Sequence, residues 1–99
     1  MYKGSTPTFI LKLPVHADSI TAMQVTFVQE NNSMLSIDME RITLDSTYAT
    51  FTLEEWETLE FVSGLIADIQ LTIWTNDGKT IVSDIKKIAI QKKYPEDIY

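Results

Sequence analysis

The side chains that could perform chemistry are few in this chain. It has one histidine, His16, and no cysteine, so it lacks a thiolate nucleophile, a disulfide framework and a thiolate metal ligand. His16 lies two residues before Asp18, and a histidine oriented by a carboxylate is the pair that general-base catalysis uses. A single histidine in a polar loop is far more often plain surface, so we expect it to have no catalytic or ligand role.

The common active-site motifs are missing as well. The chain has no Gly-x-Ser-x-Gly, no glycine-rich phosphate loop and no His-x-x-x-His pair, which are signatures of hydrolases, nucleotide-binding proteins and zinc sites. The acidic block Glu54, Glu55, Glu57 and Glu60 falls on an expected helix, where it cannot supply the alternating loop oxygens of a calcium site. We therefore predict that the protein is not an enzyme and binds no cofactor or metal.

Length and charge narrow the class further. The 99 residues predict one domain over 1–99, with a flexible arm at 1–7 and a tail at 94–99. No apolar run approaches the roughly 20 residues of a membrane span, and no signal-peptide pattern is visible. The net charge of −6 opposes nucleic-acid binding. We expect a protein that folds in a cytoplasm and binds neither membranes nor nucleic acids.

The charges are unevenly spread along the chain. Five of the eight bases lie in the last quarter, and the acidic block lies in the middle. A molecule with an acidic end and a basic edge could stack head to tail with its own copies. An ordinary solvated surface is the alternative. The basic residues are Lys79, Lys86, Lys87, Lys92 and Lys93.

A long final hairpin is expected over 65–90, with its turn at 76–79. The Asp77-Gly78 pair between apolar runs favours a two-residue type I′ turn. Counting from that turn places Trp74 opposite Ile81 and points one face of the first strand at the core. A β-bulge within 83–87 would turn Ile85 inward and its charged neighbours outward. The inward face comprises Leu65, Ala67, Ile69, Leu71 and Ile73.

Shorter alternating segments precede the hairpin. Alternation of apolar and polar residues predicts strands over 8–13, 22–29, 34–39, 41–44 and 48–53. The first is expected at a sheet edge because Pro14 ends it, and 41–44 is either a bent continuation or a separate strand. We predict an all-β, immunoglobulin-like two-sheet β-sandwich, with a barrel as the alternative.

One helix interrupts the strands, at about 53–62. Thr52 and Glu55 fit a capping box, and Trp56 and Leu59 lie three apart on one face. We expect these two apolar side chains to anchor the helix across one end of the sheets. Glu54, Glu57 and Glu60 should then face solvent.

Several aromatic, apolar and basic residues are candidates for contacts. Trp74 and Ile81 fall together on a nominally outward face near the hairpin tip, and exposed aromatics can bind proteins or sugars. Burial of Trp74 by intramolecular packing is the alternative. The candidate interface residues are Tyr48, Trp74, Ile81, Lys86 and Lys87.

The order of these pieces resembles a known kind of protein. The start Tyr2-Lys3-Gly4-Ser5-Thr6-Pro7-Thr8-Phe9-Ile10-Leu11 and the later block Phe51-Thr52-Leu53-Glu54-Glu55-Trp56-Glu57-Thr58-Leu59 are similar to small proteins encoded among tail genes of phages and prophages of Gram-positive bacteria. The helix before a long hairpin also resembles the immunoglobulin-like N-terminal domain of siphophage upper baseplate proteins, which attaches receptor-binding parts to the tail.

This resemblance implies a non-enzymatic structural or assembly protein of a phage or prophage tail or baseplate. Its expected partners are other tail subunits or its own copies. Its expected location is the virion tail, after assembly in the host cytoplasm. The alternative is a carbohydrate-binding module that aids adsorption to the bacterial cell wall, which predicts Trp74 or Tyr48 exposed in a shallow groove.

Overall fold

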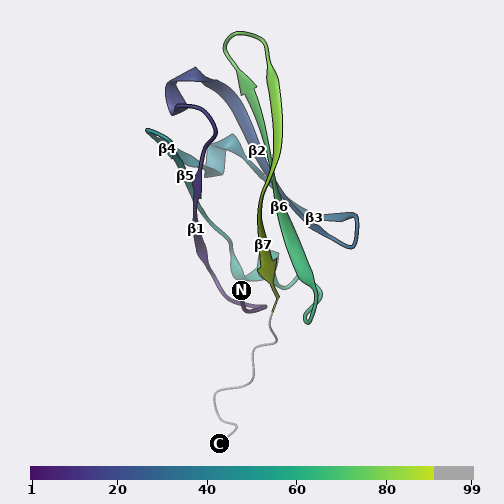
Figure 1. Ribbon diagram of the computed structural model, residues 1–99. Coiled ribbons are helices and arrows are strands. Elements are labelled where there is room, and N and C mark those ends of the chain that lie inside the picture. Colours follow the sequence, from purple (N-terminus) through teal and green to yellow (C-terminus); the bar gives the residue numbers. More distant parts are fainter. Residues whose placement is uncertain (91–99) are drawn as a thin grey trace, which may run out of the picture.

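The computed structural model describes residues 1–90, apart from the side chains of Asp84 and Ile85 (Figure 1). Strands dominate it, and its helical pieces are short. In chain order the elements are β1 Thr8–Lys12, the 3₁₀ turn η1 Ala17–Ser19, β2 Ile20–Gln29, β3 Asn32–Asp38, the 3₁₀ turn η2 Met39–Arg41, β4 Thr43–Asp45, β5 Tyr48–Thr52, α1 Glu55–Thr58, β6 Ile66–Thr75 and β7 Thr80–Ala89.

The strands form two antiparallel sheets packed face to face, with strand orders β1-β5-β4 and β3-β2-β6-β7 (Figure 1). The predicted all-β sandwich is therefore confirmed. The short segment expected within 41–44 is a separate strand, β4, in the smaller sheet. One strand departs from the strand order of constant-type immunoglobulin domains. In that order the second strand lies between the first and the fifth, whereas here β2 lies in the other sheet, between β3 and β6.

A cluster of four phenylalanines joins the two sheets. Phe9 and Phe51 from the smaller sheet stack at a centroid distance of 5.3 Å, and Phe27 from the larger sheet meets Phe9 edge to face at 5.5 Å. Phe61, which follows α1, packs edge to face on Phe27 at 5.5 Å. Edge-to-face and offset contacts at this spacing suit the ring quadrupoles. The loop after α1 is thus anchored to the core by Phe61.

The final hairpin confirms the predicted bulge and most of the predicted core face. Leu65, expected on that face, precedes β6 and is half-buried, and the inward direction expected for Ile85 concerns a side chain outside the described ones. Ala67, Ile69, Leu71 and Ile73 are fully buried. The pairing passes from Ile69 opposite Lys86 to Gln70 opposite Asp84, so Ile85 is the extra residue of a β-bulge.

The predicted turn type is wrong, and so is the predicted register of the hairpin between the turn and the bulge. Gly78 alone among the turn residues has a positive φ, +85°. Its N–H donates to the Thr75 carbonyl, and the Thr75 N–H donates to the Lys79 carbonyl. This is a three-residue loop with glycine in the left-handed position, not a two-residue type I′ turn. Trp74 therefore faces Thr80, and Ile81 lies opposite Ile73.

The 30–33 segment makes the tighter turn. Glu30 and Asn31 have φ values of 48° and 66°, and Gln29 pairs with Asn32. Two successive positive φ angles identify the type I′ geometry. Pairing then skips Met34, because Phe27 faces Leu35 and Val28 faces Ser33, which places a bulge in β3.

The predicted helix over 53–62 is wrong in length and in orientation. α1 covers four residues, and its capping box joins Glu54 and Glu57 instead of Thr52 and Glu55. Trp56 and Leu59 are exposed, at 61% and 50%, whereas Glu57 is 1% exposed. The predicted apolar anchors thus face solvent, and one of the predicted solvent-facing glutamates is buried.

An ion pair explains the burial of Glu57. Arg41 Nη1 and Nη2 donate to the two carboxylate oxygens of Glu57, each at 2.5 Å, and the Glu54 N–H donates to Glu57 Oε1 at 2.8 Å. Bidentate Arg–carboxylate bonds of this kind are among the stronger ones in proteins. They orient the short helix with its acidic side chain inward, so the apolar side chains on its other face point outward.

The segment expected to be a flexible arm is attached to the body. The Met1 amino group donates to the Ala89 carbonyl at 2.8 Å, and the Gly4 N–H donates to Thr58 Oγ1 at 2.9 Å. The Thr58 hydroxyl lies 2.8 Å from the Ser5 carbonyl oxygen, to which it donates. Residues 1–7 therefore cover one end of the sandwich. The expected tail at 94–99 lies outside the described residues, as do Lys92 and Lys93.

Candidate interaction surfaces

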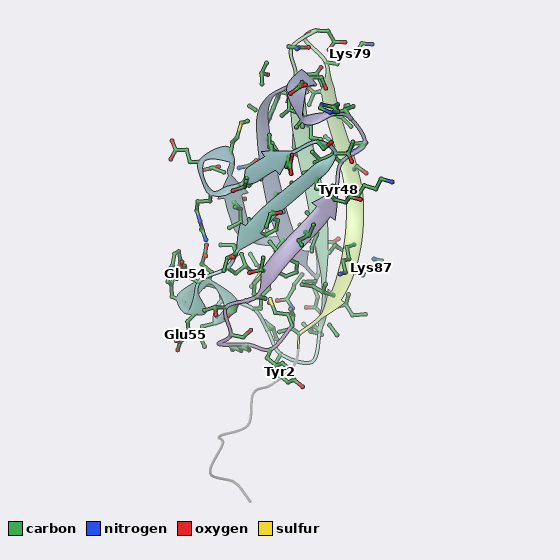
Figure 2. All side chains as sticks on the ribbon, turned by 90° about the vertical axis from the view of Figure 1, so that its left-hand side faces the viewer. Tyr2, Tyr48, Glu54, Glu55, Lys79 and Lys87 are labelled. Atoms are coloured by element: carbon green, nitrogen blue, oxygen red, sulfur yellow. The ribbon has the colours of Figure 1, made fainter. Side chains whose placement is uncertain are left out.

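The five residues predicted to form an interface do not gather in one place. Tyr48 is 47% exposed on the outer face of the three-stranded sheet, which faces the viewer in Figure 2, and Trp74 is 39% exposed on the outer face of the other sheet. Ile81 is half-buried against the core, because the register of the hairpin differs from the prediction. Lys86 and Lys87 are exposed on β7, and Lys87 Nζ lies 2.7 Å from Asp68 Oδ1.

The edge strands of the two sheets differ in how they are protected. β1 and β4 border the smaller sheet, and β3 and β7 the larger one. Natural edges avoid unwanted pairing by being short, bulged or charged. β4 has three residues, β3 is bulged at Met34, and β7 is bulged at Ile85 and carries Lys86 and Lys87. β1 has five residues in an unbroken register.

The backbone of β1 shows which groups point outward. The Leu53 N–H donates to the Pro7 carbonyl, and the Leu13 N–H donates to the Thr47 carbonyl. These bonds make the odd-numbered residues of β1 the hydrogen-bonded partners of β5, since such pairs alternate along an antiparallel ladder. Thr8, Ile10 and Lys12 therefore direct their N–H and C=O groups away from β5. We call these three residues the β1 edge.

The side chains of the β1 edge are also accessible. All three are exposed, and Ile10, at 67%, is the most accessible large apolar residue among those that the structure describes. The neighbouring strand presents Tyr48 beside Lys12 and Thr50 beside Ile10 on the same outer face. An exposed apolar side chain on an unbulged edge strand is the arrangement that accepts a further strand. Pro14 predicted an edge position for this strand, but only the backbone pairing shows which groups point away from β5.

A groove adjoins Trp74 on the opposite sheet. It has a volume of about 390 Å³ and lies between β2, β6 and η2. Trp74 and Met39 supply its apolar walls, and Gln24, Asp38 and Glu40 supply polar groups. Asp38 precedes η2 without making a side-chain capping bond. The groove therefore combines an exposed indole with hydrogen-bonding oxygens, the combination expected for the carbohydrate-binding alternative.

A third exposed set lies at the α1 end of the sandwich. Figure 2 shows Tyr2, Glu54 and Glu55 at this end, opposite Lys79 at the hairpin tip. Trp56, Leu59 and Val62 are half or more exposed. The buried Gln29 side chain bonds both backbone groups of Val62, at 2.8 and 2.9 Å, which fixes this loop. This surface was not predicted, because helical spacing indicates Trp56 and Leu59 as buried anchors of the helix.

The His16–Asp18 pair closes a turn. His16 Nδ1 accepts the Asp18 N–H at 3.2 Å and lies 3.4 Å from Asp18 Oδ2, with both side chains exposed. The imidazole nitrogen that faces the carboxylate is thus already occupied as the cap of η1. Within the described part of the chain, no three histidine, aspartate or glutamate side chains form a group suited to a metal ion.

No helix among the described residues has the length and apolar character needed to cross a membrane. Comparison with known proteins adds no relative, because no protein-family model, no curated protein and no solved structure matches the chain. Its function must therefore be argued from the β1 edge, the Trp74 groove and the α1 end themselves.

Proposed function

We propose that the chain is a non-enzymatic structural or assembly protein of a phage or prophage tail or baseplate. It acts through protein–protein contacts with other tail subunits or with its own copies, in the virion tail and in the host cytoplasm during assembly. The observation that carries the assembly role is the β1 edge: a regular strand whose outward backbone groups have no hydrogen-bond partner within residues 1–90 and whose Ile10 side chain is exposed.

The tail assignment rests on the resemblance of 2–11 and 51–59 to tail-region proteins of phages of Gram-positive bacteria. The first of these stretches contains β1 apart from its last residue, Lys12. Strand addition at an edge supplies affinity through backbone bonds and selectivity through side chains. A small subunit can therefore hold a neighbour through this edge without a deep pocket.

Capture of partners tests this function. The immobilised chain is incubated with a lysate that contains assembled tails and free tail subunits, and bound proteins are identified by mass spectrometry. We expect named tail or baseplate subunits on the wild-type chain and fewer on Ile10→Lys, which adds charge to the β1 edge. Ser36→Lys, at an exposed position on β3, is the matched control. Loss of all tail proteins, together with a strictly monomeric chain, would contradict the proposal.

A second candidate function follows from the Trp74 groove. An indole face packs against the C–H face of a sugar ring, while Gln24, Asp38 and Glu40 can bond its hydroxyls. We propose carbohydrate binding at the cell wall as this alternative. In a Trp56→Phe background, which leaves Trp74 as the only tryptophan, wall polysaccharide should shift the fluorescence. An unchanged spectrum up to saturating polysaccharide would exclude it.

A further inference from the structure

We propose that two copies of this chain join by antiparallel pairing of their β1 strands, with the two-fold axis at Ile10. The result is one continuous sheet of order β4-β5-β1-β1-β5-β4. This inference rests on the proposed role of the β1 edge in assembly and names a second copy of the chain as its occupant.

The backbone of β1 fits this pairing. Thr8, Ile10 and Lys12 point their N–H and C=O groups outward, as the bonds from Leu53 to Pro7 and from Leu13 to Thr47 require. Rotation about Ile10 brings Ile10 opposite its copy and Thr8 opposite Lys12. Each outward N–H group of one copy then meets an outward C=O group of the other copy, and each outward C=O group meets an N–H group.

Other registers fit less well. Centring on Ile10 overlaps β1 over its full length, whereas centring on Thr8 would place β1 opposite residues 4–8, of which only Thr8 belongs to the strand. Centring on Lys12 would place two ammonium groups directly opposite each other, which is destabilising in a sheet. The length of the overlap and the charge of Lys12 thus select one register.

The side chains support the same register. Ile10 is 67% exposed and would cover its own copy, an apolar cross-strand pair of the kind that stabilises sheets. Each Lys12 meets Thr8, so no like charges are opposed. The row across the interface on the outer face becomes Thr50, Ile10, Ile10 and Thr50, since Ile10 pairs with Thr50 within each copy.

The remaining edges are poorer choices for a second copy. Self-pairing of β7 would oppose strands that carry Lys86, Lys87 and a bulge, and β3 is bulged within its length. β4 offers three residues. Devices of this kind protect edges from pairing, so the contact is assigned to β1, which has no bulge and carries one lysine, at its last position.

A single-cysteine variant tests the register directly, because the chain contains no cysteine. Residues of a hydrogen-bonded antiparallel pair have Cα atoms about 5.5 Å apart, inside the roughly 4.4–6.8 Å that a disulfide spans. Ile10→Cys should therefore form a covalent dimer under mild oxidation. Thr43→Cys, exposed on the same outer face but on β4, is the matched control and should remain monomeric under those conditions.

Light scattering across a concentration series measures the contact without a crosslink. The wild type should reach twice the chain mass, and Ile10→Pro should raise the Kd by roughly tenfold or more, because proline removes a donor from each strand. The Ile10 N–H does not bond to β5, so circular dichroism should show an intact fold. Ile10→Val, which keeps the donor and a β-branched side chain, should still dimerise.

The outcomes separate this inference from the assembly role. A monomeric wild type with no disulfide from Ile10→Cys overturns the dimer. If tail subunits are still captured, and Ile10→Pro blocks that capture, then the β1 edge binds a different strand and the assembly role stands. If neither a dimer nor capture occurs, both proposals fail.

Discussion

Glu57 is buried although it carries a charge, because its carboxylate is bonded by Arg41 and by the Glu54 N–H. Sequence spacing predicted the reverse: Trp56 and Leu59 recur at a helical interval, which normally marks a buried face. The spacing could not reveal that Arg41, sixteen positions earlier, would lie beside α1. A residue-level pattern fails where a long-range partner changes the cost of burying a charge.

Removal of Arg41 should destabilise the protein more than removal of the charge on Glu57. The Arg41 side chain is 37% exposed and that of Glu57 is 1% exposed, so Arg41→Met leaves a carboxylate buried without its cation. Loss of one partner of a fully buried pair costs about 3–5 kcal/mol, and the exposure of Arg41 reduces this to roughly 2–3 kcal/mol. Glu57→Gln should cost less, since the guanidinium can be solvated. Urea unfolding followed by tryptophan fluorescence compares the two variants, and equal losses would contradict this asymmetry.

The same pair predicts a pH dependence. The hydrogen bond from Arg41 lowers the pKa of Glu57 below its usual value. A lowered pKa in the folded state contributes stability above the unfolded pKa of about 4.3, and that contribution is lost as pH falls through the folded value. The difference in unfolding free energy between wild type and Glu57→Gln should therefore be largest near neutral pH and shrink on acidification. Denaturant titrations at stepped pH measure it, and a difference that grows below pH about 4 would refute the assignment.

At the level of elements, the final hairpin shows what alternation can and cannot predict. Alternation of apolar and polar residues predicted the inward face from Ala67 to Ile73. The bulge at Ile85 was predicted because an unbroken register would place charged residues opposite apolar ones. The turn type did not follow, because Asp-Gly suits both a two-residue turn and a longer loop with glycine left-handed. One residue of loop length moved Ile81 from a predicted outward position to the core side.

Gly78 should be the residue on which this turn depends. Its φ is +85°, and no atom lies within 4 Å of the position that a Cβ would take. Gly78→Ala should therefore lower stability by about 1 kcal/mol through backbone strain alone, without a steric clash. Gly78→Asn should cost less, because asparagine tolerates the left-handed region better. Thermal melts of the two variants test this, and an unaffected alanine variant would mean that the loop has another conformation.

For the whole molecule, the sequence predicted the two-layer sandwich but not the allocation of strands to sheets. Local alternation fixes which side of a strand is buried. It does not say that β1 pairs with β5, more than thirty positions away, or that β2 separates β3 from β6. Candidate surfaces that depend on strand pairing could therefore not be predicted from the sequence either. Trp74 and Tyr48 were recognised from residue type, whereas the open β1 edge is visible only after pairing is known.

The two ways of self-association predict different particles. Pairing through β1 is isologous and closes at two copies, whereas stacking of the acidic α1 end on the lysines of β7 is heterologous and continues with concentration. Backbone bonds and an Ile10 contact depend weakly on salt, but contacts between exposed glutamates and Lys86 are screened within a Debye length of about 10 Å at 0.1 M. We therefore expect a mass that stops at the dimer and changes little between about 0.05 and 0.5 M salt.

Charge reversal adds an independent check at the same scale. Glu55→Lys reverses an exposed charge at the α1 end and should leave the dimer unchanged, while Ile10→Pro should remove it. If instead the mass rises without limit at low salt, and Glu55→Lys abolishes that growth, the copies associate head to tail. The β1 edge would then remain accessible within the stack, available for a strand from another protein.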